Sequence, residues 1–91
     1  MGKTTLVLGA SVNTERYSNK AIQKLRANKI EVFAIGGKKG TVLDVEIENE
    51  KLPFKNIDTV TLYLNPTRQK EYYEYILTLK PNRVIFNPGT E

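Results

Sequence analysis

Short runs of β-forming residues alternate with helical patterns along this chain, and that alternation limits its fold more than any other feature. Four runs rich in β-branched and aromatic residues predict strands, at Thr4–Leu8, Glu31–Ile35, Thr59–Leu64 and Arg83–Phe86. Helical patterns between them predict helices from Asn19 to about Asn28 and from Pro66 to about Leu79. Because the connections are short, the crossovers should be right-handed and the sheet parallel.

A further strand is expected at the edge of that sheet. Apolar and polar residues alternate from Val45 onward within Thr41–Ile47, which is typical of an exposed or edge strand. The predicted fold class is therefore α/β: a Rossmann-like open parallel sheet of about five strands in the order 3-2-1-4-5, with helices on both faces. The 91 residues are expected to form a single domain, residues 1–91.

The turn after the first strand has the composition of a phosphate site. Gly9-Ala10-Ser11 ends the strand, and Arg16 and Ser18 follow at the predicted start of the helix, with Ser18 as its N-cap. We expect the turn to bring backbone N–H groups, two hydroxyls and a guanidinium toward one point. Helix N-terminal amides and the positive end of the helix dipole favour an anion there.

The end of the second strand is basic. An NAD site would place an acidic residue near this point to hold the ribose hydroxyls, whereas this chain has Gly36-Gly37-Lys38-Lys39-Gly40. This composition predicts a nucleotide with an additional phosphate, and NADP satisfies that condition as well as other nucleotides do. Asn65-Pro66 and Asn87-Pro88-Gly89 follow two other strands, so they should lie on the same rim of the sheet.

Composition excludes several kinds of function. The chain has no cysteine and no histidine, which excludes disulfides, thiolate metal sites, cysteine nucleophiles and histidine-based acid–base catalysis. Its apolar runs are far shorter than the roughly 20 residues that cross a bilayer, and no signal-peptide core is present, so a cytoplasmic protein without membrane contact is expected. The net charge of +4 comes from scattered residues, and no nucleic-acid-binding motif is found.

These motifs together resemble a known family. Gly9-Ala10-Ser11, Arg16-Tyr17-Ser18, Gly37-Lys38, Tyr63-Leu64-Asn65-Pro66 and Asn87-Pro88-Gly89-Thr90-Glu91 occur in this order along the whole chain. They resemble the small stand-alone CoA-binding proteins, Rossmann-type domains related to the CoA-binding domain of the succinyl-CoA synthetase α subunit.

The resemblance implies a role for each matching residue. CoA phosphates would be held by Gly9, Ala10, Ser11, Arg16 and Ser18. Lys38, after Gly37, would meet the 3′-phosphate end of the nucleotide. The rest of the cleft would be lined by Asn65, Pro66, Asn87, Pro88 and Gly89. The chain departs from the family pattern at Glu91, where a further helix and strand would be expected, so the domain is predicted to lack them.

The leading interpretation is non-catalytic binding of coenzyme A or acyl-CoA, with no catalytic residue and no metal. One alternative is an NADP-binding oxidoreductase or a ligase fragment, because NADP also carries an additional ribose phosphate. Another is a structural or partner-docking subunit whose nucleotide site is vestigial. An incomplete sheet edge would favour a homo-oligomer.

Overall fold

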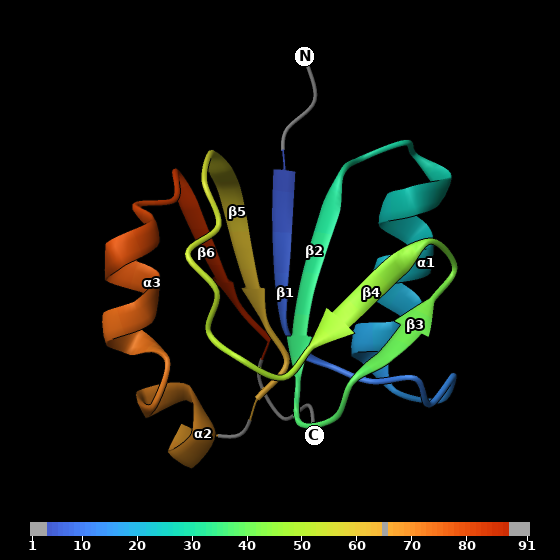
Figure 1. Ribbon diagram of the computed structural model, residues 1–91, viewed down its shortest axis with the longest axis horizontal. Coiled ribbons are helices and arrows are strands. Elements are labelled where there is room, and N and C mark those ends of the chain that lie inside the picture. Colours follow the sequence, from blue (N-terminus) through green and yellow to red (C-terminus); the bar gives the residue numbers. More distant parts are fainter. Residues whose placement is uncertain (1–3, 65, 88–91) are drawn as a thin grey trace.

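The computed structural model describes residues 4–64 and 66–87 and shows a six-stranded sheet in the order β3-β4-β2-β1-β5-β6. All neighbouring strands are parallel except the β3–β4 pair. The strands are β1 (Thr4–Ala10), β2 (Val32–Gly36), β3 (Gly40–Val42), β4 (Val45–Glu48), β5 (Ile57–Leu62) and β6 (Arg83–Phe86). The predicted α/β class is confirmed, and the five predicted strands lie in the predicted order with β3 added at one edge (Figure 1).

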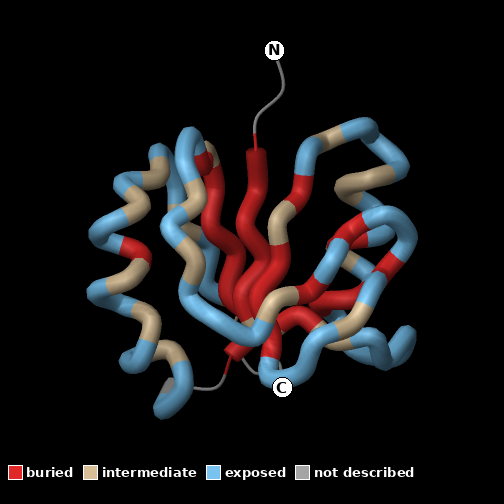
Figure 2. The backbone as a smooth tube through the Cα atoms, in the orientation of Figure 1, coloured by how far each residue is buried: buried red, intermediate tan, exposed pale blue. Residues whose placement is uncertain are grey.

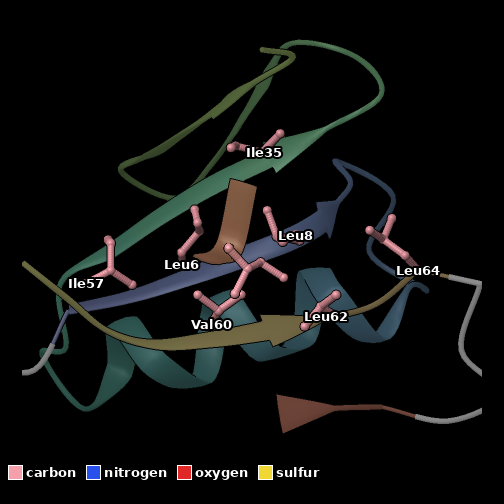
Figure 3. Close-up of a cluster of buried hydrophobic side chains, with 8 residues drawn as sticks. Leu6, Leu8, Ile35, Ile57, Val60, Leu62 and Leu64 are labelled. Atoms are coloured by element: carbon pink, nitrogen blue, oxygen red, sulfur yellow. The ribbon is translucent and has the colours of Figure 1, made fainter. Parts of the chain in front are cut away.

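Helices cover the sheet on both faces because the chain leaves β1 toward one face and β5 toward the other. On one face, Ile22 of α1 (Tyr17–Ala27) packs with Val7, Ala34 and Ile47. On the other face, Ile76 of α3 (Tyr73–Leu79) belongs to a separate apolar cluster. That second cluster includes the labelled side chains of Figure 3, namely Leu6, Leu8, Ile35, Ile57, Val60, Leu62 and Leu64. Figure 2 shows the buried central strands between the more exposed helices.

The edge of the sheet differs from the prediction. The segment expected as one edge strand within Thr41–Ile47 is a hairpin, in which antiparallel β3 and β4 are joined at Leu43 and Asp44. Leu43 adopts a positive φ of 56°, and Asp44 accepts hydrogen bonds from the Arg26 guanidinium at 2.9 and 2.7 Å. The apolar–polar alternation identified the extended residues but carried no clear signal for this turn, because Leu43-Asp44 is not one of the Asn-Gly or Asp-Gly pairs typical of a two-residue hairpin turn.

The second predicted helix is also interrupted. It forms α2 (Pro66–Lys70) and α3, separated at Glu71 and Tyr72. The N–H groups of Glu71 and Tyr72 donate to the carbonyls three residues earlier, of Arg68 and Gln69, which is the tighter 3₁₀ pattern. The Glu71 carbonyl accepts from Lys51 Nζ at 2.6 Å. The predicted end near Leu79 is confirmed, with Lys80 in the left-handed conformation just before Pro81.

The start of the first helix was predicted two residues too late. Arg16, not Ser18, is the N-cap of α1, and it makes no side-chain capping bond. Ser18 is fully buried inside the first turn. A serine near a helix start is favoured at the N-cap, but burial of Ser18 against the rest of the protein places it within the helix instead.

A groove of about 340 Å³ lies on the α1 side of β5 and β6. Its lining includes Ala21 and Leu25 of α1, Thr59 and Thr61 of β5, and Ile85 of β6. Within residues 4–64 and 66–87, no helix is long and apolar enough to cross a membrane.

Candidate functional site

A polar pocket of about 220 Å³ opens where the carboxyl ends of β1, β2 and β5 meet, toward the bottom of Figure 1. At this edge the chain leaves β1 toward α1 on one face, and it leaves β5 toward α2 and α3 on the other. A crevice forms where the strand order reverses in this way, and ligands of open α/β sheets bind there. The pocket is lined by Gly9, Ala10, Ser11, Arg16, Gly36, Gly37, Tyr63, Leu64, Arg68 and Tyr72.

Gly9 forms the floor of the pocket and must be glycine for the strands to meet. It has a φ of +86°, and a Cβ there would stand 2.6 Å from the Tyr63 carbonyl oxygen. The β1–β2 register shifts between Leu8 and Ala10, so Gly9 is a bulge at the end of the strand. The close approach exposes main-chain atoms at the floor in place of side chains.

Two glycines at the end of β2, Gly36 and Gly37, line the pocket next to Gly9, and they differ in how much room they leave for a side chain. A Cβ on Gly36 would collide with the Ala10 carbonyl oxygen, so Gly36 is needed for packing β2 against the end of β1. A Cβ on Gly37 would meet no atom of the described residues within 4 Å, and its φ lies outside the positive range. The packing of the described residues therefore gives no reason for glycine at position 37.

The loop between β1 and α1 holds Arg16 at the pocket. The Asn13 N–H donates to Ser11 Oγ at 3.0 Å, and the Glu15 N–H donates to Asn13 Oδ1 at 2.9 Å. The buried Asn19 side chain fastens the loop to α1, since its Nδ2 donates to the Ser11 carbonyl at 3.0 Å. The Arg16 N–H also donates to the Asn13 carbonyl at 3.1 Å. These bonds fix the course of the loop, and three of its amides are used inside it.

Helix α2 contributes a second arginine to the lining of the pocket, Arg68. Gln69 Nε2 donates to the Leu64 carbonyl at 2.9 Å, which ties the helix to the end of β5. Arg68 Nε lies 3.3 Å from Glu71 Oε2, an ion pair in which both side chains are at least half exposed. Among the residues that the structure describes, the lining thus includes two arginines and no acidic side chain, a composition that suits an anionic ligand.

The sequence over residues 3–91 matches the family described as CoA binding domain. The chain belongs to the CoA-binding domain family. It is also similar to three solved structures. One is an uncharacterized protein, 50% identical, with a TM-score of 0.92, for which the match covers 100% of this chain and 75% of that one.

The other two structures are less similar in sequence. A conserved hypothetical protein from Pyrococcus furiosus is 21% identical, with a TM-score of 0.81, and the match covers 100% of this chain and 78% of that one. A hypothetical protein from Pyrococcus horikoshii OT3 is 26% identical, with a TM-score of 0.83, and the match covers 99% of this chain and 64% of that one. The first of these two shows the shared fold alone. No curated protein is significantly similar to this chain.

The pocket of this CoA-binding domain brings together five of the residues expected from the sequence, namely Gly9, Ala10, Ser11, Arg16 and Gly37. Ser18 is buried in α1 and Lys38 is exposed beside Gly37, and neither lines the pocket. Asn87 Nδ2 donates to Thr61 Oγ1 and to the Leu62 carbonyl, both at 2.8 Å, which holds the end of β6 against β5. Asn65, Pro88 and Gly89 lie outside the described residues, as does the side chain of Pro66.

Five lining residues of the CoA-binding domain were not among the predicted site residues. Gly36, Tyr63 and Leu64 lie within the sequence motifs, whereas no motif pointed to Arg68 or Tyr72. Arg68 lies one turn into a segment that the sequence identified as a helix, and its spacing gave no sign that it faces the sheet edge. The rotation of the chain between α2 and α3 brings Tyr72 to the pocket, and that break was not predicted. Lys51 Nζ lies 4.9 Å from the centroid of the Tyr72 ring and supports it from the loop before β5.

The resolved pKa shifts lie outside the lining of the pocket. Burial raises the pKa of Tyr75 to about 12, and its hydroxyl donates to the Leu52 carbonyl. The hydrogen bond from Arg26 lowers the pKa of Asp44. Across residues 4–64 and 66–87, no group of three or more potential metal-ligating side chains gathers.

Proposed function

We propose that this protein binds coenzyme A or an acyl-CoA without catalysing a reaction on it. Gly37 carries the proposal, because it lines the pocket and no described residue requires it to lack a side chain, whereas a ligand in the pocket would. Membership in the CoA-binding domain family supports a CoA-type ligand. The pocket is smaller than the roughly 300–1,000 Å³ that encloses a drug-sized ligand, so it would hold a phosphate-bearing part of CoA while the rest lies along the surface.

The chemistry of the lining residues fits phosphate groups. Gly9, Ala10 and Ser11 would present main-chain and hydroxyl groups, and Arg16 would supply charge-assisted hydrogen bonds. Lys38, exposed next to Gly37, would reach the 3′-phosphate of the ribose. A non-catalytic role is supported by the lack of histidine and cysteine in the sequence and by the lack of an acidic side chain among the described lining residues.

Calorimetric titration of the protein with CoA, dephospho-CoA, NADP and NAD in one buffer tests the proposal. CoA should bind more tightly than dephospho-CoA, and Lys38→Ala should remove that difference. Lys55→Ala, which removes an exposed lysine from the loop before β5, is the matched control. Preference for NADP over CoA would refute the proposal and place the protein with NADP-binding oxidoreductases.

Gly37→Ala gives a second, independent test. The added methyl group should leave the free energy of unfolding nearly unchanged and weaken CoA binding by about tenfold or more. Incubation with acetyl-CoA should release no free thiol above the rate in buffer alone. Thiol release that depends on the protein would show a hydrolytic activity and contradict the non-catalytic part of the proposal.

A further inference from the structure

The two arginines of the pocket come from opposite sides of the sheet. Arg16 belongs to the loop that leads into α1, and Arg68 belongs to α2, which continues toward α3 on the other face. Two arginines that reach one small pocket from segments on opposite faces of the sheet suit a ligand group that presents anionic oxygens in two directions. A diphosphate does this, because its two phosphorus centres carry oxygens on both sides of the bridge.

Arg68 is held in place although its helix has only five residues. Gln69 fastens α2 to the Leu64 carbonyl at the end of β5, and Lys51 Nζ donates to the Glu71 carbonyl just after the helix. Lys51 also lies over Tyr72, which lines the same pocket. The wall that carries Arg68 is therefore tied to the sheet on one side and to the loop before β5 on the other.

Arg68 already has an anionic partner in Glu71. The two side chains are 50% and 60% exposed, and their nearest atoms are 3.3 Å apart. Ion pairs at such exposed positions contribute little to stability, so exchanging the carboxylate for a phosphate costs the fold little. Glu71 does not line the pocket, so it can compete for Arg68 without occupying the ligand's place.

We infer that Arg68 and Arg16 together grip the diphosphate of the bound nucleotide, and that Glu71 competes with that diphosphate for Arg68. This inference rests on the proposed function for the identity of the nucleotide. It separates two tasks within the site. Arg16 and Arg68 select for the diphosphate, which CoA and dephospho-CoA share, while Lys38 selects for the 3′-phosphate, which only CoA carries.

Titration of four proteins with CoA, dephospho-CoA and inorganic pyrophosphate tests the inference. Arg68→Gln should weaken binding of CoA and dephospho-CoA by the same factor, about 10- to 100-fold, because a charge-assisted hydrogen bond to the shared diphosphate is lost. Glu71→Gln should tighten both by about two- to fivefold, since the competing carboxylate is gone. Lys70→Gln removes the same charge from the same helix at a residue outside the pocket lining, and should change neither.

The outcomes distinguish this inference from the proposed function. Unchanged CoA and dephospho-CoA binding in Arg68→Gln would overturn the inference and leave CoA binding intact. Weakening confined to CoA would overturn it too, because Arg68 would then contact the 3′-phosphate. If wild-type protein binds pyrophosphate in an Arg68-dependent way but binds no CoA, the inference holds and the proposed function fails. If it binds none of the three, both are refuted.

Discussion

Replacing Gly9 with alanine is expected to destabilise the protein by about 1–4.5 kcal/mol, whereas the same change at Gly37 should cost less than about 0.5 kcal/mol. Both glycines line the same pocket, so comparing the two variants separates the steric requirement for glycine at position 9 from its absence at position 37. Gly9 has a φ of +86°, and a Cβ there would lie 2.6 Å from Tyr63 O and 2.9 Å from Leu64 Cδ2. At Gly37 a Cβ would meet nothing within 4 Å.

The magnitude at Gly9 has three contributions. An L-residue forced to positive φ costs about 1–2 kcal/mol. Overpacking against a main-chain carbonyl that is fixed in β5 adds about 1–3 kcal/mol. The lower entropy of the unfolded chain with alanine returns about 0.4–1 kcal/mol. The net loss is a large fraction of the roughly 5–15 kcal/mol that stabilises a typical domain.

Urea unfolding followed by far-ultraviolet circular dichroism measures both variants against the wild type, because the chain has no tryptophan for a fluorescence assay. The midpoint should fall clearly for Gly9→Ala and stay near the wild-type value for Gly37→Ala. Equal stability of Gly9→Ala and wild type would refute the steric argument for the floor of the pocket. Equal and large losses in both variants would refute the claim that position 37 is free of structural demand.

Three further measurements test single contacts elsewhere in the protein and beside the pocket. Burial raises the pKa of Tyr75 to about 12 from its ordinary 10.0, so the neutral phenol stabilises the fold below pH 10 and this contribution is lost between pH 10 and 12. The urea midpoint should therefore fall less steeply across that pH range in Tyr75→Phe than in the wild type. Equal slopes in the two proteins would contradict this prediction. The hydrogen bond from Arg26 lowers the pKa of Asp44, so the small contribution of this pair to stability should be present above the ordinary Asp pKa of 3.8 and lost as the pH falls below it. In Asp44→Asn the urea midpoint should therefore fall less steeply at acidic pH than in the wild type. Asn19→Ala should lower the free energy of unfolding in urea by about 1–3 kcal/mol, because it removes the hydrogen bond from the buried Asn19 side chain to the Ser11 carbonyl. The variant should also bind CoA more weakly, because the loop that carries Arg16 is less well held. Wild-type CoA affinity would show that the loop holds Arg16 without this bond.

The central part of the fold could be predicted because its signals are local and strong. Thr4–Ala10 and Ile57–Leu62 are nearly continuous runs of buried β-formers, and Pro81 ends the last helix through its own covalent geometry. The hairpin turn at Leu43 and the break between α2 and α3 were not predicted. Both depend on partners distant in sequence, Arg26 in the first case and Lys51 in the second, and a local pattern cannot contain them.

The residues of the candidate site also divide into those that the local sequence could predict and those that depend on contacts distant in sequence. Gly9, Ala10, Ser11 and Arg16 were expected at one point because they follow a predicted strand at a known edge of the sheet, and the structure brings them together with Gly37. Arg68 was missed because its position depends on how α2 is tied to the sheet. Ser18 was expected there as an N-cap, and its place in the first turn of α1 buries it instead.

The width of the pocket follows from the main chain more than from the side chains around it. At Gly9 the bulge lets the Tyr63 carbonyl approach β1 to a distance that any Cβ would block, and the Tyr63 N–H donates to the Leu8 carbonyl at 2.8 Å. The ends of β1 and β5 are thereby locked together at the place where their loops diverge to opposite faces. Arg16 and Arg68 are carried by those two loops. The backbone contact among Leu8, Gly9 and Tyr63 therefore fixes the spacing between Arg16 and Arg68. For this reason Gly9→Ala should weaken phosphate binding even where the variant still folds.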